Sequence, residues 1–187
     1  MSSALRRPMS LQAFLAWEER QELRFEFDGF EPVAMTGGSA AHGRILRNVV
    51  TALTTRLRGR PCQPFGSDMK ILLAGGSIRH PDAFVVCVPV PDNATVVTEP
   101  TVVFEVLSPG TSRTDRIVKN REYRDTPSIR RYVILEQSSQ AATVFTRAGD
   151  DWIGHLLTGD AVLEMPDIGI SIPLAELYED LTFPMEE

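Results

Sequence analysis

The sequence predicts an α+β fold, with strands and helices arranged in mixed α/β layers. Its 187 residues suit one domain, and a chain of this length buries most of its apolar surface without disulfides or metals. Hydrophobic residues make up 43% and charged residues 24%, which excludes disordered, collagen-like and disulfide-scaffold proteins. The predicted elements follow the order α-β-α-β-β-β-α-β-β-β, which is typical of a layered α+β domain. We expect one domain over residues 1–187, with flexible ends at 1–9 and 181–187.

The chain is predicted to begin with a helix and a short strand. Ser10 is a good N-cap for the first helix. The apolar positions of this helix are Leu11, Phe14, Leu15 and Leu23. Residues 25–27 then form a short strand that ends at Asp28-Gly29.

A second, longer helix follows the loop Gly37-Gly38-Ser39 and ends at Gly59-Arg60-Pro61. Its apolar residues recur every four positions, at Ile45, Val49, Leu53 and Leu57. This spacing is typical of a helix that packs through one face.

Strands dominate the rest of the chain. Two are predicted at 68–73 and 77–88, before a proline-rich loop at 89–100. The β-branched run at 101–107 is a strong strand signal, and a polar helix follows at 114–124. Further strands are predicted at 131–136, 142–147, 151–157 and 168–172, with a short helix at 174–179.

The chain is acidic overall but contains two basic stretches. A net charge of −6 argues against a bulk nucleic-acid coat. Residues 41–67 contain five arginines and no acid, and residues 113–131 contain seven basic residues and three acids. Because electrostatic fields are local at physiological salt, such stretches can form a basic groove on an acidic protein. The alternative is that they are ordinary solvated helix faces.

No targeting or membrane segment is predicted. No apolar run approaches the ~20 residues that a membrane helix needs, and no apolar stretch follows the two N-terminal arginines as in a secretory signal. Cys62 and Cys87 are too few for a disulfide framework, so a reduced, cytoplasmic protein is the default expectation. With His42 and His80, these cysteines match no zinc-ligand spacing.

Glu105 is unusual because it lies inside the apolar run at 102–107. A strand this apolar is typically covered on both faces. A buried carboxylate is costly unless it is paired or binds a metal. Two alternatives remain: strand alternation points Glu105 at a solvated face, or an arginine pairs with it.

Asp82 follows Pro81 at the entrance to the strand before that of Glu105. Taken alone, Asp82 is equally typical of a turn aspartate that caps backbone N–H groups. Two adjacent strands can, however, hold Asp82 and Glu105 within a few ångströms of each other. Such oxygen ligands suit Mg²⁺ or Mn²⁺. The backbone carbonyl of Val106 is a further candidate ligand, and Glu26 could orient this metal or a second ion.

Lys119, one of only two lysines in the chain, lies on the helix after the Glu105 strand. A compact ammonium there could hold a nucleophilic water or offset phosphate charge. The alternative is an exposed lysine that pairs with Asp115 four residues earlier. Tyr123, one turn further on, lies on the same face as Lys119, where core packing is the alternative.

Several motifs make the chain similar to a known family. They include Phe25-Glu26-Phe27-Asp28-Gly29, Arg79-His80-Pro81-Asp82, Phe104-Glu105-Val106-Leu107-Ser108-Pro109, and Asp115-Arg116 with Lys119 and Tyr123. Over residues 9–180, the chain resembles the Uma-two family, bacterial proteins within the wider PD-(D/E)xK nuclease group. The Glu-Val-Leu-Ser-Pro block is the most specific of these motifs.

The resemblance implies a restriction-endonuclease-like core, in which helices flank a central mixed sheet, and a metal-dependent phosphodiesterase site. It implies that Asp82 and Glu105 are metal ligands and that Glu26 is an additional acid. Leu107 occupies the position where the wider group keeps its lysine. In this family the lysine has moved to the following helix, which implies a catalytic role for Lys119.

The leading hypothesis is therefore a Mg²⁺- or Mn²⁺-dependent DNA endonuclease. Its catalytic residues would be Glu26, Asp82, Glu105 and Lys119, with the metal on Asp82, Glu105 and Val106. The basic helices would bind the DNA backbone with little sequence preference. The candidate contacts are Arg44, Arg47, Arg113 and Arg116, with His42 and Tyr123 as accessory residues.

Two other functions are compatible with the sequence. The first is a catalytically inactive module on the same fold that binds nucleic acid or protein. The second is a phosphodiesterase that uses the same metal on a small substrate. The nuclease hypothesis is compatible with a homodimer, because cutting both DNA strands favours two active sites.

Overall fold

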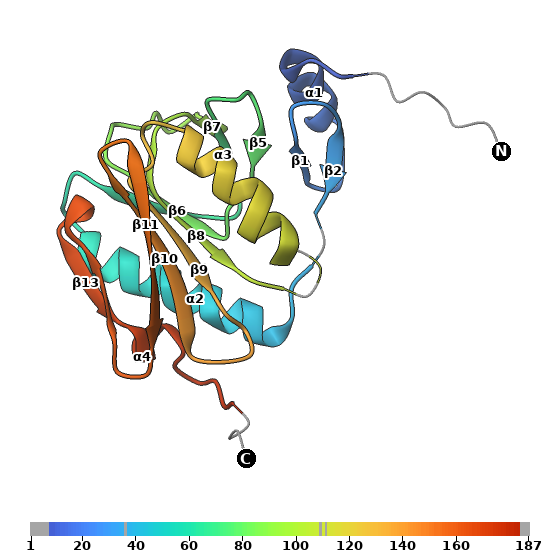
Figure 1. The fold of residues 1–187 in the computed structure, drawn as a ribbon. Helices are drawn as coiled ribbons and strands as arrows, with labels where there is room; N and C mark the ends of the chain where they lie inside the picture. The colour runs from blue at the N-terminus through green and yellow to red at the C-terminus, as the bar shows by residue number, and fades with distance from the viewer. Residues whose placement is uncertain (1–7, 36, 109, 111, 184–187) are drawn as a thin grey trace.

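A mixed sheet with helices on both faces forms the centre of the protein in the computed structural model, which describes residues 8–35, 37–108, 110 and 112–183 (Figure 1). The predicted α+β class is confirmed. The helical elements are α1 (Leu11–Glu18), α2 (Ala40–Leu57), the π-helical segment η1 (Thr114–Lys119), α3 (Asn120–Asp125), the 3-10 turn η2 (Pro166–Ile168) and α4 (Leu174–Leu177).

The central sheet has the strand order β11-β10-β9-β8-β6-β3. Its strands are β3 (Gln63–Gly66), β6 (Ala83–Val86), β8 (Pro100–Val106), β9 (Arg131–Leu135), β10 (Ala141–Ala148) and β11 (Asp151–Thr158). β8 and β9 are parallel, whereas the other neighbours are antiparallel. Because parallel neighbours need a crossover connection, η1 and α3 span the interval between β8 and β9.

Two smaller sheets flank the central one. The larger of them has the order β2-β1-β5-β4-β7, and the other is the β12–β13 hairpin. Their strands are β1 (Phe25–Phe27), β2 (Pro32–Ala34), β4 (Lys70–Leu72), β5 (Ile78–Arg79), β7 (Val96–Val97), β12 (Val162–Met165) and β13 (Ile170–Pro173). α1 and the β1–β2 hairpin lie together at one side of the molecule (Figure 1).

The central sheet is buried on both faces. Val85 and Phe104 belong to the apolar cluster that includes the stripe of α2, whereas Phe84 and Val103 belong to the cluster that includes Tyr123 of α3. Side chains alternate along a strand, so Glu105 shares the α3 face with Val103. Glu105 is only 3% exposed, which excludes the alternative of a solvated carboxylate.

The elements differ from the prediction at several boundaries. α1 ends at Glu18, and Leu23, expected on the first helix, lies beyond it with 67% exposure. The predicted strand at 77–88 is divided into β5 and β6 around Pro81, which has no N–H to donate to a ladder. The short strands β2, β3, β7 and β12 were not predicted, because they are brief; β7 lies within the segment expected to be a proline-rich loop.

The expectation of two reduced cysteines is wrong for this structure, in which Cys62 and Cys87 form a disulfide. Cys62 directly precedes β3 and Cys87 directly follows β6. Gln63 pairs with Val86 in the antiparallel ladder, so the two cysteines fall opposite each other. The number of cysteines alone does not predict this disulfide, because it depends on the register of β3 and β6.

Much of each predicted flexible end, residues 1–7 and 184–187, lies outside the described residues. Met9 and Phe183, which belong to the described parts of those ends, pack against apolar clusters. Within the part of the chain that the structure describes, no helix is long and apolar enough to cross a membrane.

Candidate active site

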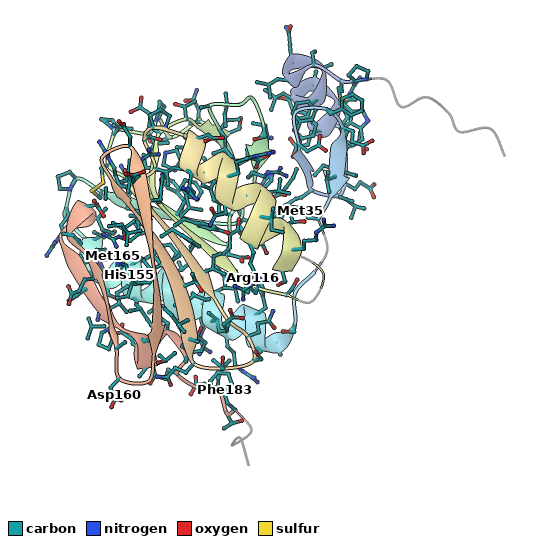
Figure 2. All side chains as sticks on the ribbon, in the orientation of Figure 1. Met35, Arg116, His155, Asp160, Met165 and Phe183 are labelled. Carbon is teal, nitrogen blue, oxygen red and sulfur yellow. A yellow bond between two sulfur atoms is a disulfide. The ribbon has the colours of Figure 1, made fainter. Side chains whose placement is uncertain are left out.

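A cavity of about 240 Å³ lies where the β1–β2 hairpin, the start of β6, the end of β8 and η1 meet. Met35, which contributes to its wall, lies between β2 and the η1–α3 segment (Figure 2). Six of the predicted site residues line this cavity: Glu26, His42, Asp82, Glu105, Val106 and Lys119. The fold therefore gathers residues that are widely separated in the sequence.

The register between β6 and β8 places Asp82 beside Glu105. Ala83 pairs with Phe104 in this antiparallel ladder, so the residue before Ala83 falls opposite the residue after Phe104. Both acids consequently reach the same end of the cavity, as their positions on adjacent strands predict. Their role as metal ligands stays a prediction.

Glu105 accepts two hydrogen bonds through one of its oxygens. Lys119 Nζ donates to Oε1 at 2.9 Å, and the Tyr123 hydroxyl donates to the same oxygen at 2.7 Å. Burial raises the pKa of Glu105; the charge of Lys119 opposes this shift, and the surrounding carboxylates add to it. Glu105 thus lies among other carboxylates in a poorly solvated part of the site.

Glu26, at the centre of β1, is held from three directions. Its Oε1 accepts the His80 N–H at 3.1 Å and lies 3.2 Å from Lys119 Nζ, while its Oε2 accepts Arg79 Nη1 at 3.1 Å. Arg79 also forms a two-point pair with Glu122, at 2.7 and 2.8 Å. Burial alone would raise the pKa of Glu26, but the charges of Lys119 and Arg79 outweigh it and the pKa is lowered.

Asp82 is positioned by a histidine and a backbone amide. Its Oδ1 lies 3.2 Å from His42 Nε2, and its Oδ2 accepts the Val106 N–H at 2.7 Å. The hydrogen bond to Asp82 raises the pKa of His42, although burial opposes the shift. His42 lies in the first turn of α2, where Ser39 is the N-cap and accepts the His42 N–H at 3.1 Å.

A Gly38→Ala substitution is expected to displace the His42 ring from Asp82. A Cβ at Gly38 would lie 2.8 Å from two ring atoms of His42, which is closer than packed atoms tolerate. Loss of the Asp82 hydrogen bond should lower the pKa of His42 towards its ordinary value. An NMR titration of the three histidines would measure this change.

Gly37→Ala is the matched control, because a Cβ at Gly37 meets nothing within 4 Å. Equal pKa values for His42 in the wild type and the Gly38→Ala variant would contradict the prediction.

The four arginines predicted to bind DNA lie outside the lining of the cavity. Arg47 donates to Asp180 at 2.9 Å, and Arg116 pairs with Glu136. Arg44 and Arg113 are exposed, and neither has an ion-pair partner among the described residues. The two helices therefore present fewer unpaired cations than their sequences suggest.

Two further parts of the site were not predicted. The sequence indicates Asp115 only as part of a family motif and as a surface partner for Lys119, yet it is 1% exposed and lines the cavity. The Arg79–Glu122 pair was missed entirely. The four-residue spacing of Asp115 and Lys119 was an available signal, but spacing alone does not distinguish a buried pair from an exposed one.

The sequence of residues 11–175 matches the family model Uma2, described as "Putative restriction endonuclease". The chain belongs to the Uma2 family. The resemblance found in its motifs is thereby confirmed.

Relatives of this Uma2 protein share most of its length. It is 32% identical over 178 residues to the uncharacterized protein slr1290 of Synechocystis sp., covering 94% of each chain. It is 29% identical over 152 residues to the uncharacterized protein sll1609 of the same organism, covering 79% of this chain and 86% of the other.

A solved structure supports the fold of the Uma2 chain. It is the crystal structure of "a putative nuclease belonging to DUF820" from Anabaena variabilis, with a TM-score of 0.74 and 18% identity. The match covers 91% of this chain and 98% of the other. At this identity the similarity establishes that the two chains share a fold, not that they share a chemistry.

The donor chemistry of the cavity suits a hard divalent cation. Asp82 and Glu105 supply carboxylate oxygens, and a cation would offset both the burial that chiefly raises the pKa of Glu105 and the smaller repulsion from neighbouring carboxylates. Among the described residues, no three His, Cys, Asp or Glu side chains already surround one point as metal ligands. A metal would therefore rest on two side chains, with the Val106 carbonyl, water or substrate completing its coordination.

Proposed function

We propose that this Uma2 protein is a Mg²⁺- or Mn²⁺-dependent endonuclease that hydrolyses DNA phosphodiester bonds. The observation that carries the proposal is the convergence of Asp82, Glu105 and Lys119 in one cavity. The description of the family supports the same chemistry. A purely structural role would not require two carboxylates and a buried lysine to face a common hollow.

Each residue of the site would have a distinct task. When bound, the metal would polarise the scissile phosphate and lower the pKa of the attacking water. Asp82 and Glu105 would hold it, assisted by the Val106 carbonyl. Lys119 would stabilise the negative charge that develops on the phosphate. Glu26, fixed by Arg79, would keep Lys119 directed into the cavity.

Binding of the DNA backbone would use exposed cations near the cavity. Arg113 precedes η1 and Arg44 lies on α2 one turn after the cap, so both are close to cavity-lining positions in the chain. Contacts with phosphates would make the affinity fall steeply with salt and depend little on base sequence. Cleavage of both strands would favour a homodimer with two active sites.

Nicking of supercoiled plasmid tests this function directly. We expect cleavage with Mg²⁺ or Mn²⁺ and none with EDTA. Tight DNA binding without cleavage in either metal, over many substrates, would instead support the catalytically inactive binding module. Hydrolysis of nucleotides in preference to DNA would indicate a small-substrate phosphodiesterase.

A further inference from the structure

Lys119 is surrounded by three carboxylates inside the cavity. Its Nζ lies 2.9 Å from Glu105 Oε1, 3.2 Å from Glu26 Oε1 and 3.3 Å from Asp115 Oδ1. Lys119 is 6% exposed, so these acids rather than water determine where the ammonium rests. Glu105 receives the shortest of the three contacts, and Lys119 thus rests on one oxygen of the carboxylate that would bind the metal.

The other two carboxylates differ in how they are balanced. Glu26 already has the charge of Arg79 on its Oε2 and the His80 N–H on its Oε1. Asp115 is 1% exposed, and its Oδ1 has no hydrogen-bond partner within the described part of the chain. Lys119 is the basic side chain paired with Asp115 there. Asp115 therefore retains an unused acceptor directed at the ammonium.

The backbone around Asp115 holds this acceptor in place. Asp115 and Lys119 both belong to the π-helical segment η1, a rare conformation that is frequent at functional sites. The buried Tyr132 hydroxyl donates to the Asp115 carbonyl at 3.1 Å, which anchors the turn to β9. The backbone that carries the Asp115 side chain is thus tied to the central sheet.

We propose that Asp115 is a positioning residue that receives Lys119 when Glu105 exchanges the lysine for a metal ion. A metal ion on Glu105 would repel the ammonium that rests on the same carboxylate, so metal binding would favour movement of Lys119 towards a second acceptor. Asp115 Oδ1, 3.3 Å from Nζ, is such an acceptor. It would receive the lysine without removing the ammonium from the cavity. This inference rests on the proposed metal-dependent function.

A double-mutant cycle on Mn²⁺ affinity tests the exchange without relying on cleavage. The variants are Asp115→Asn, Lys119→Gln and the double variant, all compared with the wild type by calorimetry. We expect Asp115→Asn to weaken Mn²⁺ binding roughly 10- to 100-fold, as the loss of an outer-shell partner typically does. Lys119→Gln should strengthen binding, because it removes the cation that competes for Glu105.

The decisive quantity is the effect of Asp115→Asn in the Lys119→Gln background. If Asp115 acts by accepting the lysine, the loss of affinity should largely disappear there. An equal loss in both backgrounds would show that Asp115 contributes only its charge, and would overturn the inference. Thermal unfolding without metal checks that each variant is folded, and Lys119→Met offers a second uncharged background.

The two proposals fail in different ways. A wild type that binds Mn²⁺ and cleaves DNA, but shows no coupling in the cycle, overturns the role of Asp115 alone. A wild type that binds no Mn²⁺ overturns the metal-dependent function and this inference with it.

Discussion

A Lys119→Gln variant is expected to cleave DNA roughly 100 to 1,000 times more slowly than the wild type, which is the usual cost of removing one electrostatic donor from an active site. The variant should still bind Mn²⁺. The glutamine keeps a hydrogen-bond donor of similar reach, but it has no charge to place against the phosphate. Rates of plasmid nicking at saturating metal would measure the loss. The prediction separates the role of Lys119 in charge stabilisation from the roles of the metal-binding acids.

Lys70→Gln is the matched control, because Lys70 is the other lysine of the chain. Lys70 also pairs with a glutamate, Glu18 of α1, and its side chain is 12% exposed. It lies outside the lining of the cavity. Similar rates of cleavage in the two variants would contradict a specific role for Lys119.

An Arg79→Met variant is expected to lose roughly 3–5 kcal/mol of unfolding free energy, the cost of breaking a buried ion pair from one side. Arg79 is 2% exposed and joins Glu26 of β1 to Glu122 of α3. Its removal would leave both glutamates without this partner in a poorly solvated region. Urea unfolding at neutral pH would measure the change.

Arg56→Met provides the comparison at a more exposed pair. Arg56 binds Glu176 at 2.6 and 2.7 Å, but the two side chains are 27% and 35% exposed. Water screens such a pair, so we expect a loss of at most about 1 kcal/mol. Equal destabilisation by the two substitutions would show that Arg79 does not anchor the site as we infer.

The sequence predicts the centre of this site well because strand geometry is regular. An acid inside an apolar strand and another at the entrance to the preceding strand were enough to place Glu105 and Asp82 together. The apolar character of β8 indicated a covered strand, but only the structure excluded a solvated position for Glu105. The motifs around these acids also indicated the family, which the match over residues 11–175 shows.

Contacts between distant elements could not be predicted in the same way. Arg79 and Glu122 are 43 residues apart, and their pairing depends on how α3 packs across the end of β5. Asp115 and Lys119 have the spacing of an ordinary surface pair, and only tertiary packing buries them. The neutralisation of Arg47 by Asp180, 133 residues away, has the same origin.

Calorimetric titration of Mn²⁺ into the wild type and a Glu105→Gln variant, with plasmid nicking assayed on the same samples, tests the central claim most directly. The account predicts that the wild type binds Mn²⁺ and nicks DNA. It predicts that Glu105→Gln, which keeps the shape of the side chain but lacks a carboxylate, does neither. A Glu105→Gln variant that binds Mn²⁺ and nicks DNA like the wild type would contradict a metal-dependent site built on Glu105.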